Sequence, residues 1–414
     1  MKDETGLRIL FLLTQSLESP GGGGRFWPLA KALTQLGHEV TLVALHHDYA
    51  SLSERRFRRD GVDVWYVAQM HVRKVGNAKL YFSPWQLLWV TFWATVRLTW
   101  AALRTPCEVV HVCKTQPMNG VAAWVLHWWR RTPVFLDSDD YEAVNNRFRG
   151  RNQQRLVAWF EDWMPSFATG IIAGTRYILD RFADLGFPRE RMTLVPNGVD
   201  ETRFALLQEL DLDDRLRQLR QELGLLPEHR VVVYVGSMSL VSHAVDLLLQ
   251  ALALVVQREP QARLVLVGSG EDLPGLQALA TDLDIQDQTL FVGRVASELV
   301  PLYFRLGEMT VDPLQDTIPA RSSLSLKLVE SLVAGVPCVT TDIGDRQEIV
   351  GEAGIAVTAG NAAALAEAIL TIFHDPAQQT AMRQEAESMR PRLLWRSRVQ
   401  EVITLYQQTL REKL

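Results

Sequence analysis

The sequence predicts an α/β fold made of two domains, each built on a parallel sheet. Short apolar runs alternate with longer helix-like runs along almost the whole 414-residue chain, a pattern typical of parallel strands joined by crossover helices. The pattern restarts after a polar, charged stretch at about 201–229. With 47% hydrophobic and 22% charged residues, the chain has enough apolar material for two ordinary cores.

The first half contains the strands of the first predicted sheet. LRILFLL (7–13) is the first strand, a glycine run precedes a helical stretch, and GHEVTLVAL (37–45) is the second strand. Together they predict a βαβ unit. Further strands are predicted at 62–67, 108–112, 133–137, 170–174 and 192–198.

The second half repeats this pattern and predicts a second sheet. Its strands are expected at 230–236, 262–268, 288–293, 308–313, 337–341 and 354–358. Residues 388–414 are predicted to form a terminal pair of helices.

Composition excludes several classes of protein. A formal net charge of −5 argues against a nucleic-acid-binding protein, which usually has a basic domain. Cys107, Cys113 and Cys338 lack the paired spacing of a zinc or redox site and are expected in a reducing compartment. The first apolar run is too short, and the residues before it too acidic, for a signal peptide. We therefore expect a cytoplasmic protein.

The second half resembles the retaining glycosyltransferases of family 4. YVGSM, LVLVGSGED, LFVGRV and KLVESLVAGVPCVTTDIGDRQEIV follow one another in the order seen in that family, and VPNGVD at 195–200 also fits. The resemblance implies a GT-B fold, with two facing Rossmann-like domains and an interdomain cleft. It places an acceptor-side domain at 1–200, on which a helix at 393–414 packs back, and a nucleotide-sugar-binding domain at 201–392.

The resemblance also implies a reaction. The enzyme would move a sugar from a nucleoside diphosphate sugar to a hydroxyl of a glycan or membrane-linked acceptor, and the leaving phosphate would take the acceptor's proton. It implies no cofactor beyond this co-substrate and no catalytic metal. Two alternatives stay open: an epimerase or phosphorylase of the same fold, or a sugar-nucleotide-binding protein without catalysis.

Glu330 is the first candidate for donor binding. It lies in an apolar helix, where a carboxylate can accept hydrogen bonds from both ribose hydroxyls, and family members use the matching Glu in this way. Eight residues earlier, where the family has another Glu, this chain has Ser322. The donor sugar is therefore not predicted.

Two segments are expected to bind the diphosphate, because each precedes a helix and helix N-termini present free N–H groups to anions. The first is the run Gly22, Gly23 and Gly24, with Arg25 beside it. The second is the loop that contains Ser323 and Leu324. An ordinary flexible loop is the alternative for the glycine run.

The family's phosphate-binding Arg and Lys are absent, and other residues are expected to replace them. Ser237 follows Gly236 at the Arg position, and His243 stands near the Lys position. Lys327 and Arg321 are the replacements we expect, with Lys327 preferred. Gly268, after the next strand, would let a base or ribose approach the backbone. A solvated lysine and a residue near a helix cap are the alternatives for Lys327 and His243.

Four carboxylates lie at the end of the strand at 133–137 or just past it: Asp137, Asp139, Asp140 and Glu142. Parallel sheets bind ligands at this edge. By the resemblance, Asp139 lies where relatives carry a cleft His, so it is expected to accept the acceptor's proton or to hold a sugar hydroxyl. A metal site is ranked low, and a solvated helix cap is the alternative.

A basic, aromatic stretch at 55–104 predicts peripheral contact with an anionic membrane. No acidic residue occurs between Val64 and Cys107, while five tryptophans and several arginines and lysines do. Such a composition is typical of a helix that lies on lipid headgroups. A transmembrane helix is rejected because the strands before and after it belong to one sheet. A crossover helix packed on the sheet is the alternative.

Overall fold

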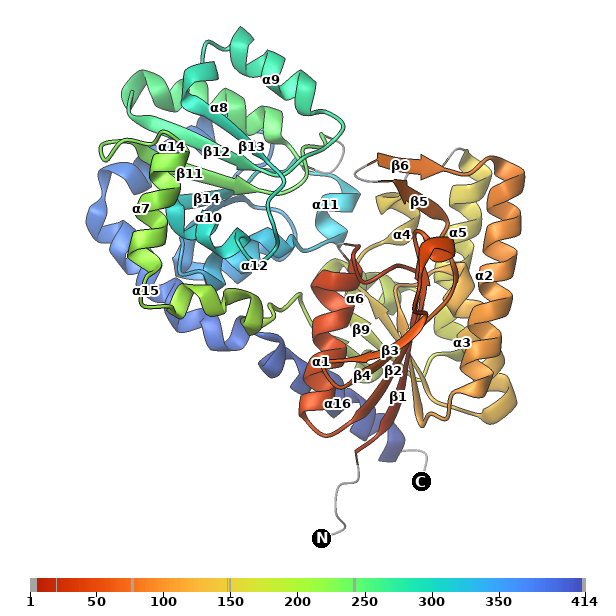
Figure 1. The fold of residues 1–414 in the computed structure, drawn as a ribbon. Helices are drawn as coiled ribbons and strands as arrows, with labels where there is room; N and C mark the ends of the chain where they lie inside the picture. Colours follow the sequence, from red (N-terminus) through yellow and green to blue (C-terminus); the bar gives the residue numbers. More distant parts are fainter. Residues whose placement is uncertain are drawn as a thin grey trace. The chain divides into compact units, whose positions relative to one another are not determined.

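The computed structural model describes residues 6–19, 21–75, 78–146, 148, 150–240 and 243–411 (Figure 1). The chain forms two compact units. Met1–Asn197 with Arg398–Leu414 make up the first, here called the N-terminal unit, and Gly198–Ser397 the second, the C-terminal unit. The division falls between Asn197 and Gly198, inside the VPNGVD segment.

The N-terminal unit is built on an eight-stranded sheet in the order β10-β9-β8-β7-β1-β2-β4-β3. All pairs are parallel except β3–β4. The parallel strands are β1 (Arg8–Leu13), β2 (Glu39–His46), β4 (Val62–Gln69), β7 (Val109–Cys113), β8 (Val134–Ser138), β9 (Gly170–Ala173) and β10 (Met192–Leu194). Each of them corresponds to a strand predicted from the sequence.

Three strands of this unit have no counterpart in the prediction. They are the antiparallel edge strand β3 (Arg56–Arg59) and the hairpin of β5 (Val72–Val75) and β6 (Ala78–Tyr81). The sequence of β3 is RFRR, and arginine carries no strand signal. Charged side chains suit an edge strand, because they discourage pairing with other chains.

Helices cover both faces of this sheet (Figure 1). Leu10, Val110 and Val134 pack in one core with residues of α2 (Pro84–Arg104) and α3 (Pro117–Arg130). On the opposite face, Tyr406 of α16 (Trp395–Arg411) contacts the rings of His111 and Phe135. The remaining helices are α1 (Trp27–Gln35), α4 (Glu142–Asn145), α5 (Arg151–Trp163) and α6 (Arg176–Asp184).

The glycine run does not form the loop expected from the sequence. Gly22–Phe26 is a single π-helical turn that continues directly into α1. A Cβ on Gly22 would lie 2.2 Å from the carbonyl oxygen of Ser16, and one on Gly23 2.7 Å from that of Leu17. The glycines therefore let this turn pack against the segment that follows β1.

The C-terminal unit contains a parallel six-stranded sheet in the order β13-β12-β11-β14-β15-β16. All six strands correspond to the prediction: β11 (Arg230–Val235), β12 (Ala262–Val267), β13 (Thr289–Gly293), β14 (Met309–Asp312), β15 (Cys338–Thr341) and β16 (Gly354–Val357). The helices are α7 (Leu212–Glu222), α8 (Val245–Arg258), α9 (Leu273–Asp282), α10 (Val300–Leu306), α11 (Ile318–Ser322), α12 (Leu326–Val333), α13 (Arg346–Val350), α14 (Ala362–His374) and α15 (Pro376–Leu393).

Alternate strand residues of this sheet face two separate cores. Val232 and Leu264 pack with α8 and α14, whereas Val231 and Val265 pack with α7 and α10. Burial on both faces explains why these strands read as continuous apolar runs. Across the part of the chain that the structure describes, no helix combines the length and apolarity needed to cross a membrane.

Candidate functional site

A buried ion cluster forms at the carboxyl end of β14 in the C-terminal unit. Asp312 is the last residue of that strand. Its carboxylate lies 3.1 Å from Nζ of Lys327 in α12 and 3.3 Å from Nε of Arg346 in α13. Arg346 also donates to the carbonyl oxygens of Ala320 and Ser323, so it holds the segment between β14 and α12 in place.

The charges in this cluster depend on one another. Burial acts to raise the pKa of Asp312, but Lys327 and Arg346 outweigh it and the pKa lies below its usual range. Burial lowers the pKa of Lys327, and Asp312 counteracts this shift. A further anion near Lys327 would raise the pKa of the lysine. The negative charge would stabilise the charged ammonium and offset the effect of burial.

His243 belongs to the same cluster. Its Nδ1 lies 3.1 Å from Nζ of Lys327. Burial, and then the charge of Lys327, lower the pKa of His243 to about 3. The imidazole is therefore neutral at pH 7 and accepts a hydrogen bond from the lysine. The structure thus brings together His243 and Lys327, two of the residues expected to bind phosphate.

Glu330 lies one turn after Lys327 and is buried. Its Oε1 accepts a hydrogen bond of 2.6 Å from Arg203. Burial raises the pKa of Glu330, and the guanidinium of Arg203 counteracts that shift. The sequence analysis missed Arg203, which lies 127 residues from its partner in a 3-10 helix (Glu201–Gln208).

The segment before α12 differs from the expected loop. Part of it forms α11, and both Ser322 and Leu324 are buried. The Ser322 hydroxyl donates to the carbonyl of Pro319, so it is not presented to a sugar in this conformation. Ser323 donates to the same carbonyl. Side-chain packing inside this short turn, which no local pattern reveals, accounts for the difference.

Arg321 is exposed on α11 and forms a two-pronged ion pair with Asp316, at 2.6 and 2.7 Å. Because the pair is exposed to solvent, its strength is modest. A phosphate could compete for the guanidinium, so the expectation for Arg321 remains a prediction.

The loops after β11 and β12 approach each other closely. Gly268 has φ of +140°, and a Cβ there would lie 1.8 Å from the carbonyl oxygen of Gly236. Contact between the two loops thus requires a glycine at 268, whereas a Cβ on Gly236 would lie 2.8 Å from the hydroxyl oxygen of Tyr234. Ser237 is exposed at the end of β11, and its carbonyl accepts a hydrogen bond from Tyr234.

Asp139 lies at the carboxyl edge of the sheet in the N-terminal unit, in a cluster around a lysine that the sequence analysis missed. Nζ of Lys114 lies 2.8 Å from Asp139, 2.8 Å from Asp140 and 2.9 Å from Glu142. Burial raises the pKa of Asp139 to about 7, although Lys114 acts in the opposite direction. The neighbouring carboxylate of Glu142 has a lowered pKa because Lys114 and Gln116 outweigh its burial.

The three carboxylates around Lys114 are also the candidate ligands of a metal ion. Carboxylate oxygens of Asp139, Asp140 and Glu142 come close enough together to hold a cation. The ammonium of Lys114, within 2.9 Å of all three, already supplies positive charge at that position. These residues are therefore a poor fit to a divalent ion.

Arg25 and Asp137 form a second buried network in the same unit. Nη2 of Arg25 lies 2.7 Å from Asp137, whose other oxygen lies 3.1 Å from Nε2 of His111. The expectation that Arg25 adds charge beside a phosphate loop is wrong, because its side chain points into the core and pairs there. The N–H groups of Gly22 and Gly23 bond to Ser19, which weakens the case for a phosphate cradle there.

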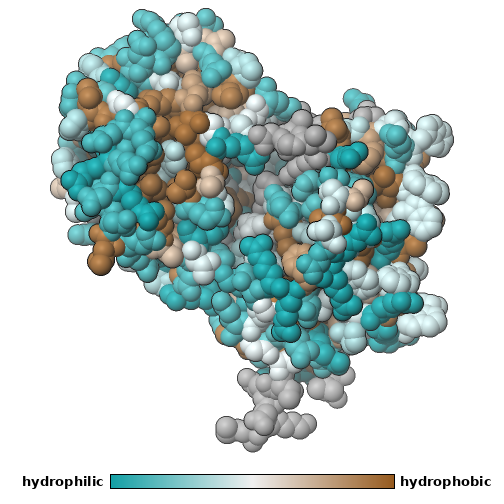
Figure 2. Space-filling view, viewed as in Figure 1, coloured by the Kyte–Doolittle hydropathy of each residue, from teal (hydrophilic) through white to brown (hydrophobic). Residues whose placement is uncertain are grey.

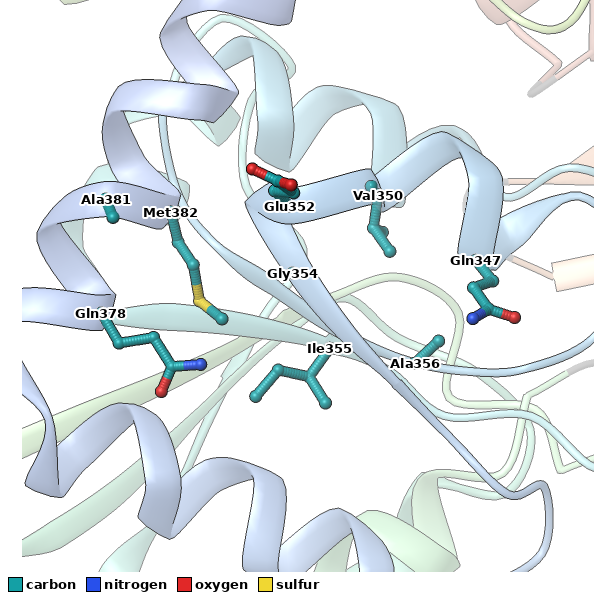
Figure 3. Close-up of a pocket in the computed structure, with 10 residues that line it drawn as sticks. Gln347, Val350, Glu352, Gly354, Ile355, Ala356, Gln378, Ala381 and Met382 are labelled. Atoms are coloured by element: carbon teal, nitrogen blue, oxygen red, sulfur yellow. The ribbon is translucent and has the colours of Figure 1, made fainter.

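A pocket of about 390 Å³ lies elsewhere in the C-terminal unit, beside the edge strand β16 (Figure 3). Gln378 and Met382 of α15 and Ile355 of β16 point toward it. Its lining includes none of the residues expected to bind the donor. We place the chemistry at the charged clusters, because the pocket has only Glu352 as a charged lining residue.

The sequence only partly indicated the charged residues that the sequence analysis missed. Asp312 is the second-last residue of a predicted strand and Lys114 comes two residues after another, positions near which α/β sheets place ligand-binding groups. Arg203 and Arg346 had no such signal, because their partners are distant in the sequence.

Two family models match the chain. Residues 21–198 match the one described as glycosyl transferase 4-like domain, and residues 229–375 the one described as glycosyl transferases group 1.

Curated proteins match over part of their length. The GDP-mannose-dependent alpha-(1-6)-phosphatidylinositol monomannoside mannosyltransferase of Mycolicibacterium smegmatis is 29% identical over 212 residues, which are 50% of this chain and 54% of that protein. The D-inositol 3-phosphate glycosyltransferase of Thermomonospora curvata is 28% identical over 258 residues, covering 59% and 58% of the two chains. The matched region thus spans little more than half of these relatives.

Solved structures match over nearly the whole chain. Sucrose-phosphate synthase of Thermosynechococcus elongatus has a TM-score of 0.75 at 18% identity, covering 98% of this chain and 100% of that one. Anabaena HepE in complex with UDP has a TM-score of 0.70 at 20% identity, covering 97% and 100%.

Proposed function

Because the chain belongs to glycosyltransferase family 4 and has the GT-B fold, we propose that it transfers a sugar from a nucleoside diphosphate sugar to a hydroxyl of a glycan or lipid-linked acceptor. In the proposed reaction the bond between the sugar C1 and the leaving phosphate breaks, and C1 bonds to the acceptor oxygen on the same face. The leaving phosphate takes the acceptor's proton. Retention is part of the proposal.

The cluster of Lys327, Asp312 and His243 carries this proposal. It places a buried ammonium at the carboxyl edge of a parallel sheet, where such folds bind their ligands. A donor diphosphate next to Lys327 would favour the charged lysine, whose pKa burial lowers. The charge that develops on the leaving phosphate would be stabilised in the same way.

Glu330 is the proposed ribose-binding residue. A carboxylate can accept about four hydrogen bonds, so ribose hydroxyls can join Arg203 on it. In the N-terminal unit, Asp139 is proposed to contact the acceptor hydroxyl. Its pKa of about 7 would let it exist in both protonation states near neutrality.

The names of similar proteins suggest which donors and acceptors to test. One relative is named for GDP-mannose and a phosphatidylinositol mannoside, and the HepE structures contain UDP or UDP-glucose. Donor base and sugar thus differ among the proteins similar to this chain. A lipid-linked acceptor is consistent with the first of these names.

A panel of UDP-, GDP- and ADP-sugars tests the proposal. Each donor is scored for thermal stabilisation of the protein and for slow hydrolysis to the nucleoside diphosphate. We expect one donor to stabilise the wild type and to be hydrolysed, and Glu330→Gln to lose about 1–3 kcal/mol of donor binding. Glu228→Gln, an exposed change in the same unit, is the matched control.

Two outcomes would count against transfer. If no donor stabilises or is hydrolysed, the chain does not use these nucleotide sugars. If a donor stabilises the protein but no nucleoside diphosphate is released, with or without glycan and lipid acceptors, the chain is a binding protein.

A further inference from the structure

One side of the N-terminal unit exposes an unusual number of aromatic side chains. The face, here called the tryptophan face, is formed by α2, α3 and α5. Its exposed aromatic residues are Trp85, Trp89, Phe92, Trp93 and Trp100 of α2, Trp124, Trp128 and Trp129 of α3, and Trp159 of α5. Trp85 is 82% exposed and Trp129 is 70% exposed. Soluble surfaces rarely gather so many large apolar groups without a binding role.

Helices α2 and α3 have apolar residues on both their inward and their outward faces. The residues that α2 turns toward the sheet are small or aliphatic: Ala94, Leu98, Ala101 and Ala102. In α3 the inward residues include Gly120, Ala122 and Ala123. The core is therefore complete without the tryptophans, and packing does not explain their presence.

The tryptophan face is continuous across its helices. α2 packs against α3. From α3, Trp124 lies 5.9 Å from Trp163, whose ring stacks on Trp159 of α5 at 6.0 Å. Figure 2 shows pale side chains along the edge that carries α2, as expected for tryptophan, which lies near the middle of the hydropathy scale.

The charges of the face are predominantly positive. Neither α2 nor α3 contains an acidic residue, and both end in arginine, Arg104 and Arg130. In α5 the two acidic residues are engaged, since Glu161 is buried and Asp162 pairs with Arg181. Arg151 and Arg155 add exposed positive charge. Tryptophan combined with arginine is the composition that suits the interface of a bilayer with anionic headgroups.

We propose that the tryptophan face docks on an anionic lipid bilayer, with the tryptophan rings inserted among the headgroups. The face extends beyond the stretch at 55–104 predicted from the sequence, because α3 and α5 contribute to it. It does not include all of the basic run at 55–59. Arg56 stacks on Trp65, on the side of α2, but Arg59 stacks on Trp27, on the side of α1. The side chains of Lys74 and Lys79, also part of that prediction, lie outside the described residues.

The docked face would lie next to the acceptor side of the site. A crossover helix begins at the carboxyl edge of its sheet and ends at the amino edge. α2 ends five residues before the first residue of β7, so its first turns, with Trp85 and Trp89, lie toward the carboxyl edge that carries Asp139. Docking would therefore bring a lipid-linked hydroxyl to the level of Asp139; this part of the inference rests on the proposed function.

Vesicle binding tests the docking without any donor or acceptor, so its failure is distinct from a failure of sugar transfer. The full chain is sedimented with phosphatidylglycerol or phosphatidylcholine vesicles. We expect binding at least about tenfold stronger to phosphatidylglycerol, weakened by salt, with a blue shift of tryptophan fluorescence. The variant W85A/W89A/W128A/W129A should bind at least about tenfold more weakly.

Matched variants separate docking from general effects. L210A/L226A removes two exposed leucines of the C-terminal unit and should bind like the wild type. R104Q/R155Q leaves every tryptophan in place and should lower binding to phosphatidylglycerol alone. Circular dichroism checks that each variant is folded. Equal binding by the wild type and the tryptophan variant would overturn the proposal. A second result would also overturn it: the wild type does not bind vesicles, light scattering shows a dimer, and the tryptophan variant is a monomer. The tryptophan face would then bind a second copy of the chain.

Discussion

At the scale of single residues, Lys114 is the group on which the acidic segment after β8 depends. It is buried, and its ammonium bonds to Asp139, Asp140 and Glu142. Three carboxylates so close together repel one another unless a cation lies between them. Their proximity is therefore stable only because Lys114 projects from the neighbouring strand end.

Replacing Lys114 by Met should destabilise the N-terminal unit. The change leaves buried carboxylates without a counter-charge, which we expect to cost about 3–5 kcal/mol of the free energy of unfolding. Urea unfolding followed by circular dichroism measures the loss. Asp140→Asn, which removes the most exposed of the three partners, should cost about 1 kcal/mol or less. Equal losses in the two variants would contradict this account of the cluster.

The protonation of Asp139 should make stability depend on pH. Burial raises its pKa in the folded chain to about 7, above the ordinary value of 3.8. The folded state therefore keeps this proton after the unfolded state has lost it, so the contribution of Asp139 is fully present below about pH 4 and is lost as the pH rises to about 7.

Asp139→Asn removes that contribution. Compared with the wild type, the variant should gain relative stability as the pH is raised from 4 to 8. Urea midpoints of both proteins at several pH values measure the difference. A constant difference across this range would show that Asp139 is already ionised at low pH in the folded chain.

At the scale of elements, the loops after β11 and β12 meet through glycine. Gly268 adopts a backbone conformation that other residues rarely adopt, and its Cα faces the carbonyl of Gly236. Ser237, next to Gly236, and the cluster around Lys327 lie at the same edge of the sheet, since β11 and β14 are parallel neighbours.

Gly268→Ala should therefore strain both loops. We expect it to destabilise the C-terminal unit by about 1–3 kcal/mol and to weaken donor binding. Gly275→Ala in the exposed part of α9 is the matched control, because a Cβ there meets nothing within 4 Å. That variant should be neutral or stabilised by up to about 1 kcal/mol. Thermal unfolding with and without donor compares the two, and the account fails if Gly268→Ala behaves like the control.

At the scale of the whole molecule, the N-terminal unit includes residues from both ends of the chain. Tyr406 of α16 packs against Phe135, and its hydroxyl lies 2.5 Å from Nδ1 of His111. His111 in turn contacts Asp137. The last helix therefore completes a buried polar network that begins at Arg25.

A chain that ends at Ser397 should retain a folded C-terminal unit and lose stability in the N-terminal one. Without α16, the ring of Phe135 and the imidazole of His111 are exposed on the sheet. Limited proteolysis with mass spectrometry should show faster cleavage within 6–197 and little change within 198–397. Tyr406→Phe, which keeps the ring, should have a much smaller effect. Equal protection of both units in the truncated chain would contradict the prediction.

Local pattern in the sequence was enough to predict the parallel strands of both sheets and the family. Strands buried on both faces are continuous apolar runs, and this signal depends only on neighbouring residues. Glu330 and Lys327 were chosen as candidates because they belong to a helix whose sequence resembles that of the family, and their roles stay predictions. The edge strand β3 and the π-helical turn at Gly22–Phe26 were not predicted, because the sequences RFRR and GGGRF carry no strand or helix signal.

The tertiary structure alone decided which charges meet and which aromatic residues are exposed. Lys114 and Asp139 come from neighbouring strand ends, Arg203 and Glu330 are 127 residues apart, and Arg25 turns into the core to meet Asp137. The sequence of α2 could not show whether its tryptophans or its alanines face the sheet. Contacts between distant residues decide these points, because a buried charge takes whichever partner the fold brings near it.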